Sequence, residues 1–109
     1  MDKLTASEAT DLILPCVKKC EIWYKKAEKS KFFRDNLPLS DIKFFISEMK
    51  MGLEANNFML IRDMANKITE NGTSNFFCTE IKVYGIKSMV QSLTIQLNNI
   101  RFYCNKTET

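Results

Sequence analysis

Apolar residues in the first third of the chain recur at the spacing of an α-helix. They are Ala9, Leu12, Ile13, Cys16, Cys20, Trp23, Tyr24 and Ala27. The segment before them has a capping-box pattern, with Thr5 at the N-cap and Glu8 three residues later. A helix over residues 6–29 is therefore predicted. Because Pro15 lacks a backbone N–H, we expect a kink near residues 11–12, and a helix that begins at Pro15 is the alternative.

The middle of the chain carries two further helical stripes. The first comprises Ile42, Phe45, Ile46, Met49 and Leu53, and the second comprises Phe58, Ile61, Met64, Ala65 and Ile68. Residues 31–39 form a connector, after which Ser40 with Asp41 is expected to cap the second helix. Gly52 and the Asn56-Asn57 pair predict a tight break, although a single helix over 40–70 is the alternative. Asn71-Gly72 is the expected stop of the third helix.

The last third of the chain fits two templates. Alternating apolar residues predict a strand near 76–84. Residues 86–104 fit a helix whose stripe leaves Ile95 and Phe102 outside, or a hairpin around Asn98-Asn99 that brings both inside. The length of this segment and its lack of glycine and proline beyond position 85 favour the helix. The alternative is an antiparallel sheet over 76–104.

Four cysteines suggest covalent staples. Cys16 and Cys20 share one face of the first predicted helix, which is poor geometry for a bond between them. A strand followed by a returning helix brings Cys78 and Cys104 back to that face. We therefore predict two disulfides between these pairs, in either combination. Buried, reduced thiols are the alternative, and a zinc site fits the spacing less well.

These elements predict a single domain over 1–109. The expected fold is mainly α, a small disulfide-stapled bundle of three or four helices with one short strand. The connections are long, short and long in turn. This order resembles that of the up-up-down-down bundles of short-chain helical cytokines.

Charge distribution and targeting features bear on the cellular location of the protein. The net charge is only +3, yet the segment 18–34 has seven basic residues against two acids. The first residues have no apolar h-region, so we expect no signal peptide there, and the longest apolar stretches are too short to span a bilayer. Sequons at Asn71 and Asn105 fit an exported glycoprotein. With the disulfides, they predict a secreted protein, and a cytoplasmic location is the alternative.

The residues that most enzymes need are scarce. The chain has no histidine and no glycine-rich phosphate loop, and no acid pair lies in an apolar context. We therefore expect no enzymatic activity, no cofactor and no metal. The pI of about 8.7 is also low for a dedicated nucleic-acid-binding protein.

Two sets of residues are candidates for binding a partner. Lys18, Lys25 and Lys29 share one helical face, which indicates an anionic partner. Phe44, Met51 and Met59 lie off the main stripes, which suggests either a protein interface or a Met- and Phe-lined cavity.

These sets predict a secreted, non-enzymatic binding protein, either a cytokine-like ligand or an effector. It would act through a protein–protein surface on a receptor or host protein. The alternatives are a carrier of a small apolar ligand and an intracellular regulatory domain with free thiols.

Overall fold

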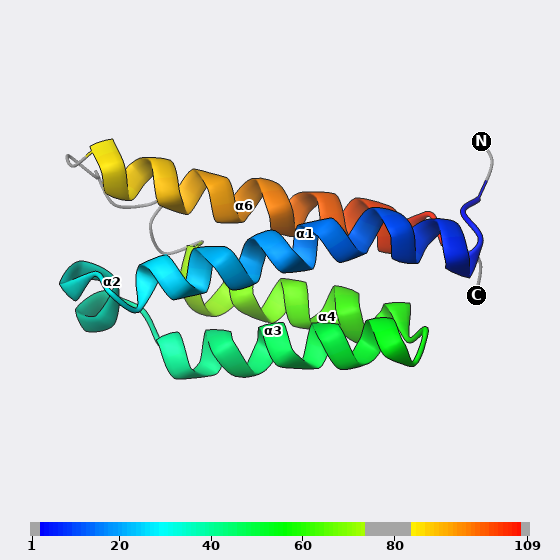
Figure 1. Ribbon diagram of the computed structural model, residues 1–109, viewed down its shortest axis with the longest axis horizontal. Coiled ribbons are helices and arrows are strands. Elements are labelled where there is room, and N and C mark those ends of the chain that lie inside the picture. The colour runs from blue at the N-terminus through cyan, green and yellow to red at the C-terminus, as the bar shows by residue number, and fades with distance from the viewer. Residues whose placement is uncertain (1–2, 74–83, 108–109) are drawn as a thin grey trace.

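Four long helices form a bundle in which neighbouring helices run antiparallel (Figure 1). The computed structural model describes residues 3–73 and 84–107. Its elements are α1 (Ala6–Ala27), α2 (Lys31–Asn36), α3 (Leu39–Glu54), α4 (Phe58–Ile68), the π-helical turn η1 (Thr69–Thr73) and α6 (Tyr84–Asn105). A mainly helical fold is confirmed.

The order of the helices differs from the expected one. α1 packs on α3 and α6, α4 packs on the same two helices, and α1 and α4 therefore lie diagonally across the bundle. Figure 1 shows α1 and α3 running in opposite directions. The up-up-down-down order, in which the first two helices are parallel, is therefore wrong. The reason is that the connector folds into the short helix α2 at the end of the bundle and does not run along it.

The first helix begins as the sequence predicts. Thr5 Oγ1 accepts a hydrogen bond from the Glu8 backbone N–H at 3.2 Å, and Glu8 Oε1 accepts one from the Thr5 N–H at 3.1 Å. The capping box is thus confirmed. The helix then runs through Pro15 to Ala27, so a first helix starting at Pro15 is wrong.

The start of α3 differs from the prediction. α3 begins at Leu39 with Pro38 at the N-cap, and no side chain caps it. The Pro38 carbonyl accepts the Ile42 N–H at 3.0 Å, so the first turn closes two residues earlier than a Ser40 cap would allow. The expected cap by Ser40 with Asp41 is therefore wrong.

The break between α3 and α4 has the hydrogen bonds of a Schellman motif. Asn56 has a φ of 53° and its N–H donates to Leu53 O at 3.3 Å. The Asn57 N–H donates to Gly52 O at 2.8 Å. Asn57 Oδ1 then accepts the Leu60 N–H at 3.1 Å and caps α4. The predicted break is confirmed, and a single helix over 40–70 is wrong.

The end of α4 is less abrupt than predicted. The α-helix ends at Ile68, and a π-helical turn continues through the expected stop at Asn71-Gly72. Two side chains satisfy carbonyls of the preceding turn: Thr69 Oγ1 donates to Ala65 O at 3.1 Å, and Asn71 Nδ2 donates to Lys67 O at 2.8 Å.

Residues 84–105 form one continuous helix, α6. The helical reading of 86–104 is confirmed, and a hairpin or sheet over this segment is wrong. Ile95 and Phe102 lie outside, as the helical template requires, each more than half exposed. The predicted strand near 76–84 falls almost wholly on 76–83, outside the described residues, and Tyr84 is already helical.

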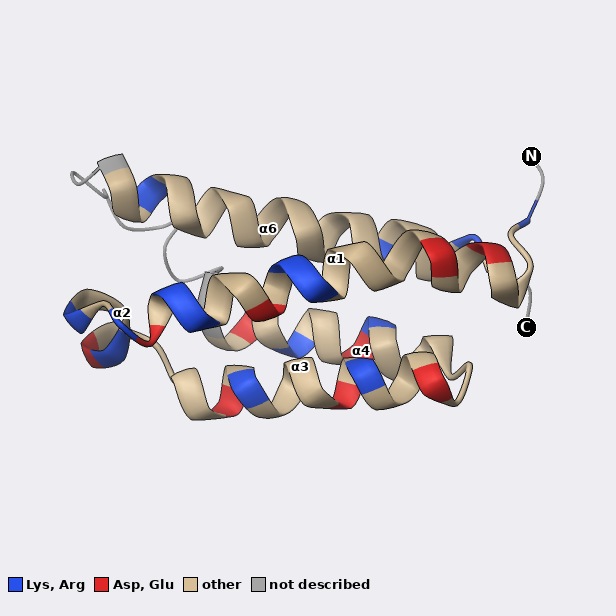
Figure 2. Cartoon of the chain, in the orientation of Figure 1, with Lys and Arg blue, Asp and Glu red and all other residues tan. Residues whose placement is uncertain are grey.

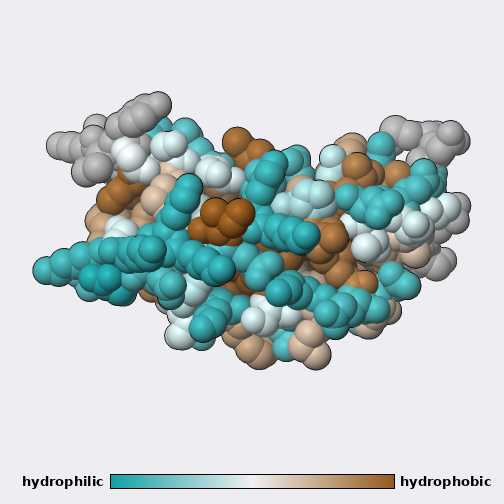
Figure 3. Space-filling view, viewed as in Figure 1, coloured by the Kyte–Doolittle hydropathy of each residue, from teal (hydrophilic) through white to brown (hydrophobic). Residues whose placement is uncertain are grey.

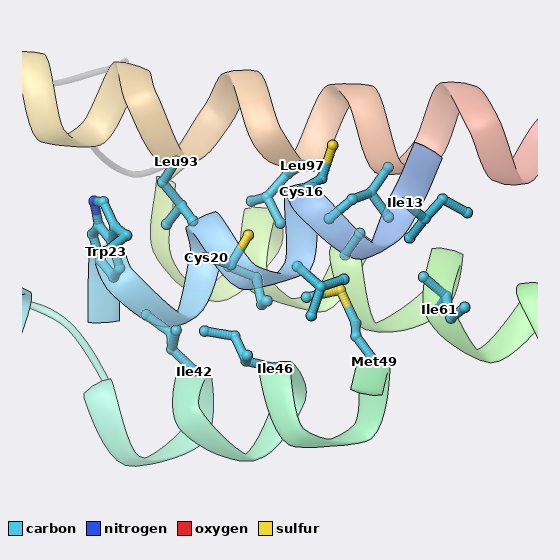
Figure 4. Packing of buried hydrophobic residues seen from close by; sticks show 14 of the residues in the cluster. Ile13, Cys16, Cys20, Trp23, Ile42, Ile46, Met49, Ile61, Leu93 and Leu97 are labelled. Carbon is cyan, nitrogen blue, oxygen red and sulfur yellow. The ribbon is translucent and has the colours of Figure 1, made fainter. Parts of the chain in front are cut away.

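Buried side chains from all four helices meet along the bundle axis (Figure 4). Two long-range hydrogen bonds fix the register of α1 against α6. The Trp23 Nε1–H donates to Met89 O at 2.8 Å. At the other end, the Leu4 N–H donates to Lys106 O at 2.8 Å. The two helices are antiparallel, so residues earlier in α1 lie level with residues later in α6.

Candidate functional site

A half-exposed isoleucine on α1 has four lysines around it. The surface neighbours of a helical residue are those three and four positions away. For Ile22 all four are lysine, namely Lys18, Lys19, Lys25 and Lys26. The lysines are exposed, and Ile22 is 55% exposed. We call these five residues the Ile22 site; Figure 3 shows apolar surface over α1 enclosed by hydrophilic side chains.

The four lysines of the Ile22 site form no ion pair with an acid among the described residues, although Glu21 and Glu28 lie near Lys25. In the part of the chain that the structure describes, one ion pair occurs, between Lys50 Nζ and Glu21 Oε2 at 3.1 Å. This pair engages the acid that directly precedes Ile22 in sequence. Figure 2 shows the basic positions of α1 gathered toward its C-terminal half. Uncompensated charge of one sign attracts partners of the opposite sign.

A groove of about 270 Å³ runs beside the Ile22 site, between α1 and α6. Its lining residues are Lys19, Ile22, Trp23 and Lys26 from α1 and Ser88, Met89 and Ser92 from α6. Isoleucine, tryptophan and methionine side chains supply apolar surface, and Lys19 and Lys26 are the charged residues among those described as lining it. The groove therefore combines an apolar floor with a positive rim.

The floor of the groove is held in place by the fold. Trp23 is 5% exposed, and its indole N–H is engaged by the Met89 carbonyl at 2.8 Å. Its ring meets the ring of Phe33 edge to face, with centroids 5.5 Å apart. This part of the groove is therefore set before any partner arrives.

A second groove, of about 220 Å³, lies between α1 and α3. Here opposite charges already face one another: Glu21 and Glu28 line it together with Lys25, Lys43 and Lys50. Its lysines are therefore partly satisfied within the protein, which makes it a weaker site for an acidic partner.

The outward face of α6 is free of charge over most of its length. No charged residue occurs from Ser88 to Ile100, and Figure 2 shows α6 almost uncoloured along its length. Ile95 and Phe102 are more than half exposed on this face. Depletion of charge around exposed apolar side chains is typical of the centre of a protein interface.

The structure distributes the sequence-predicted binding residues over three helices. Lys18 and Lys25 belong to the Ile22 site, and Lys29 is exposed just beyond the end of α1. The apolar candidates lie elsewhere: Phe44 and Met51 are exposed on α3, and Met59 is exposed on α4. The six residues therefore do not form one surface.

The carrier hypothesis gains no support from these positions. Phe44, Met51 and Met59 are each more than half exposed, so they do not enclose a ligand. No phenylalanine of the described ranges 3–73 and 84–107 lines either of these two grooves. A Met- and Phe-lined cavity is thus not formed by the residues from which it was predicted.

Two central residues were not predicted from the sequence: Ile22, the apolar centre of the site, and Trp23, the floor of the groove. Lys19 and Lys26 were expected only to lie alongside the face of Lys18, Lys25 and Lys29. A signal for the site exists in the segment KKCEIWYKK, where lysine pairs stand at equal distances on both sides of one isoleucine. Helical periodicity alone predicts that these lysines surround Ile22. Met89 could not be found in this way, because its proximity depends on the register of α6.

The predicted disulfides are not supported by the described residues. Cys16, Cys20 and Cys104 are free and buried, and Cys78 lies outside the described residues. The register of α1 and α6 places Cys104 near the level of residue 7, about 13 Å along the bundle from Cys16. The expected return of Cys104 to the level of the α1 cysteines assumed that a strand from residue 78 to 84 and the helix after it nearly cancel in length. In the structure α6 instead runs past the level of Cys16 to the start of α1.

Burial makes the described thiols poor nucleophiles. Desolvation, and secondarily the neighbouring Cys16 and Glu21, raises the pKa of Cys20 to about 12. Desolvation also raises the pKa of Cys104 to about 11, against the opposing effect of Arg62. Figure 4 shows the sulfur of Cys16 directed toward α6, beside Leu97. These thiols act as small apolar core groups.

The two sequon asparagines are exposed at helix ends. Asn71 lies in the π-helical turn, and Asn105 is the last residue of α6. Both side chains form hydrogen bonds: Asn71 with Lys67 O, and Asn105 Oδ1 with Arg62 Nη1 at 3.3 Å.

The described residues contain neither a cluster of metal ligands nor a membrane-spanning helix. Among residues 3–73 and 84–107, no three His, Cys, Asp or Glu side chains come together as metal ligands would. None of the helices in these ranges is both long and apolar enough to cross a membrane.

Comparison with protein-family models, with curated proteins and with solved structures gives no significant match. Functional inference therefore depends on the geometry and charge of the chain itself.

Proposed function

We propose that this chain is a non-enzymatic binding protein that recognises an acidic protein surface through the Ile22 site. The observation that carries the proposal is the exposed isoleucine with a lysine at every neighbouring helical position. Lysine side chains alone are common on solvated faces. A large exposed apolar side chain at the centre of such a group gives a partner both a contact point and a charged border.

Physical chemistry favours a partner of this kind. Protein interfaces have an apolar centre, which supplies most of the affinity, and a polar rim, which excludes water and selects partners. Opposite charges at the rim accelerate association and disfavour basic competitors. The uncharged face of α6 next to α1 extends the area that a protein partner could cover.

The proposal is limited to protein binding. The antiparallel order of α1 and α3 differs from that of the helical cytokine bundles, so the topology does not support a cytokine-like ligand. The three described cysteines are free and buried, so the predicted disulfides, the main indication of secretion, have no support among them. Burial of reduced thiols also fits the intracellular regulatory domain, which would bind its partner through the same site.

Site-specific photo-crosslinking tests the proposal in cells that express the full chain. A benzophenone amino acid replaces Ile22, and the same group at Met59 is the matched control. Met59 is similarly exposed, at 61%, but lies on α4, diagonally across the bundle. We expect a discrete protein adduct from position 22 alone. Its yield should fall with Lys18→Glu and Lys25→Glu, because charge reversal repels an acidic partner.

Two results would contradict the proposal. One is the same set of adducts from positions 22 and 59, which would show non-specific contact. The other is an adduct whose yield is unchanged by charge reversal and by high ionic strength, since screening weakens contacts between exposed charges.

A further inference from the structure

We infer that the partner docks as an acidic amphipathic helix, with one large apolar side chain in the α1–α6 groove and carboxylates near Lys19 and Lys26. This inference rests on the proposed function and names the partner's structure. It follows from the volume of the groove, the position of its charges and the nature of its walls.

The volume of the groove indicates the size of what enters it. Pockets that enclose small-molecule ligands measure about 300–1,000 Å³. The groove measures about 270 Å³ and is open along one side. It is therefore too small and too open to bury a typical small ligand, but it can take one aromatic or large aliphatic side chain of a docked protein. Such anchored side chains dominate the energetics of many interfaces.

The charges of the groove indicate the surroundings of that side chain. Lys19 and Lys26 are seven residues apart on α1, which is about 10 Å along the helix axis. An apolar residue with acids three or four positions away on either side gives a partner helix the same spacing. A helix parallel or antiparallel to α1 could thus place a carboxylate beside each lysine while its anchor enters the groove.

The walls of the groove favour a helix over a nucleic acid or a membrane. The α6 residues that line the groove, Ser88, Met89 and Ser92, carry no charge, and Lys87, which precedes them, is not among the lining residues. Polyanions are held mainly by many cationic contacts along their length. The groove has two cations and a central apolar floor, which matches the contact of an amphipathic helix with a hydrophobic groove.

A designed peptide provides the test with the full chain. The probe is a capped helical peptide with one phenylalanine between two glutamates seven residues apart on one face. Control peptides replace the phenylalanine by alanine or both glutamates by lysine. Trp23 is the only tryptophan, so its fluorescence and its indole N–H resonance report binding at the groove itself.

The protein variants separate the groove from the rest of the Ile22 site. We expect Lys19→Glu with Lys26→Glu to weaken peptide binding about tenfold or more. Lys67→Glu, an exposed lysine on α4, should change the affinity little. The phenylalanine peptide should shift the indole resonance, and the alanine peptide should bind at least about tenfold more weakly. Circular dichroism confirms that each variant is folded.

Each other outcome identifies what fails. Equal binding of the phenylalanine and alanine peptides overturns the anchored helix. Loss of binding with Lys18→Glu and Lys25→Glu, but not with changes at 19 and 26, overturns the groove and leaves protein binding at the Ile22 site in place. Absence of peptide binding together with a specific adduct from position 22 overturns the helix alone. Tighter binding to phosphatidylserine vesicles than to the peptide, independent of Ile22, overturns both proposals.

Discussion

Single residues decide how closely the helices can approach, and Gly52 is the clearest case. It lies in the last turn of α3, opposite α4. A Cβ atom at this position would lie 2.7 Å from Cγ1 of Ile61 and 3.2 Å from the Asn57 carbonyl oxygen. The absence of a side chain therefore permits the tight α3–α4 connection.

Replacing Gly52 by alanine should destabilise the protein. Alanine is favoured over glycine inside a helix by about 1 kcal/mol, but the clash with the buried Ile61 side chain should outweigh this gain. We expect a net loss of about 1–2 kcal/mol, measured by urea unfolding. Gly85→Ala is the control, because nothing lies within 4 Å of a Cβ there. Equal stability of both variants would contradict the close approach.

At the scale of the element, the helices differ in how their ends are satisfied. α1 begins with a complete capping box, whereas α3 begins after Pro38 with no side-chain cap. Short-range sequence patterns predicted a cap at both places. The difference arises because a capping side chain acts only if the chain enters the helix at that residue, and Pro38 starts α3 earlier.

Two alanine substitutions compare these helix ends directly. Thr5→Ala removes the acceptor for the Glu8 N–H and should lower the free energy of unfolding by about 1 kcal/mol. Ser40→Ala removes no capping bond and should change it by less than about 0.5 kcal/mol. Thermal unfolding followed by circular dichroism measures both. An equal loss from the two variants would mean that Ser40 caps α3 after all.

At the scale of the whole molecule, the buried thiols link stability to pH. An accessible thiol has a pKa near 9.0, whereas burial raises the pKa of Cys20 to about 12. The unfolded chain therefore loses this proton at a lower pH than the folded chain does. The stability associated with the neutral thiol is fully present below about pH 9 and is lost as the pH rises toward 12.

The free energy of unfolding should consequently decline between pH 9 and pH 11. For Cys20 the expected slope approaches about 1.4 kcal/mol per pH unit above the unfolded pKa. Urea unfolding at a series of pH values measures the slope. Cys20→Ala removes the titrating group and should give a flatter dependence than the wild-type chain. Identical slopes would show that Cys20 ionises equally in both states.

Much of the local structure could be predicted from short stretches of sequence. Apolar spacing located α1, α3, α4 and α6, and Asn56-Asn57 marked the break that a Schellman motif forms. The helix over 86–104 was the harder case, because alternating and helical patterns overlap there. Because this segment is a helix, Ile95 and Phe102 lie outside its buried apolar stripe and are exposed to solvent.

The candidate site was only partly predictable. Lys18 and Lys25 were recognised from their shared face, and helical spacing alone is enough to place four lysines around Ile22. Phe44, Met51 and Met59 form a separate candidate set, chosen because they lie off the main apolar stripes. Their distances from α1 depend on which helices are neighbours, and periodicity within one helix contains no information on that.

The sequence by itself determined the four long helices, the start of α1, the α3–α4 break and the basic face of α1, because these depend on contacts within a few residues. The tertiary structure alone decided the antiparallel order of α1 and α3, the register of Trp23 against Met89 and the position of Cys104. These depend on how separate apolar faces pack together, which is settled by the shape and volume of side chains far apart in the chain. The α1–α6 groove belongs to this second group, since its two walls are more than sixty residues apart in sequence.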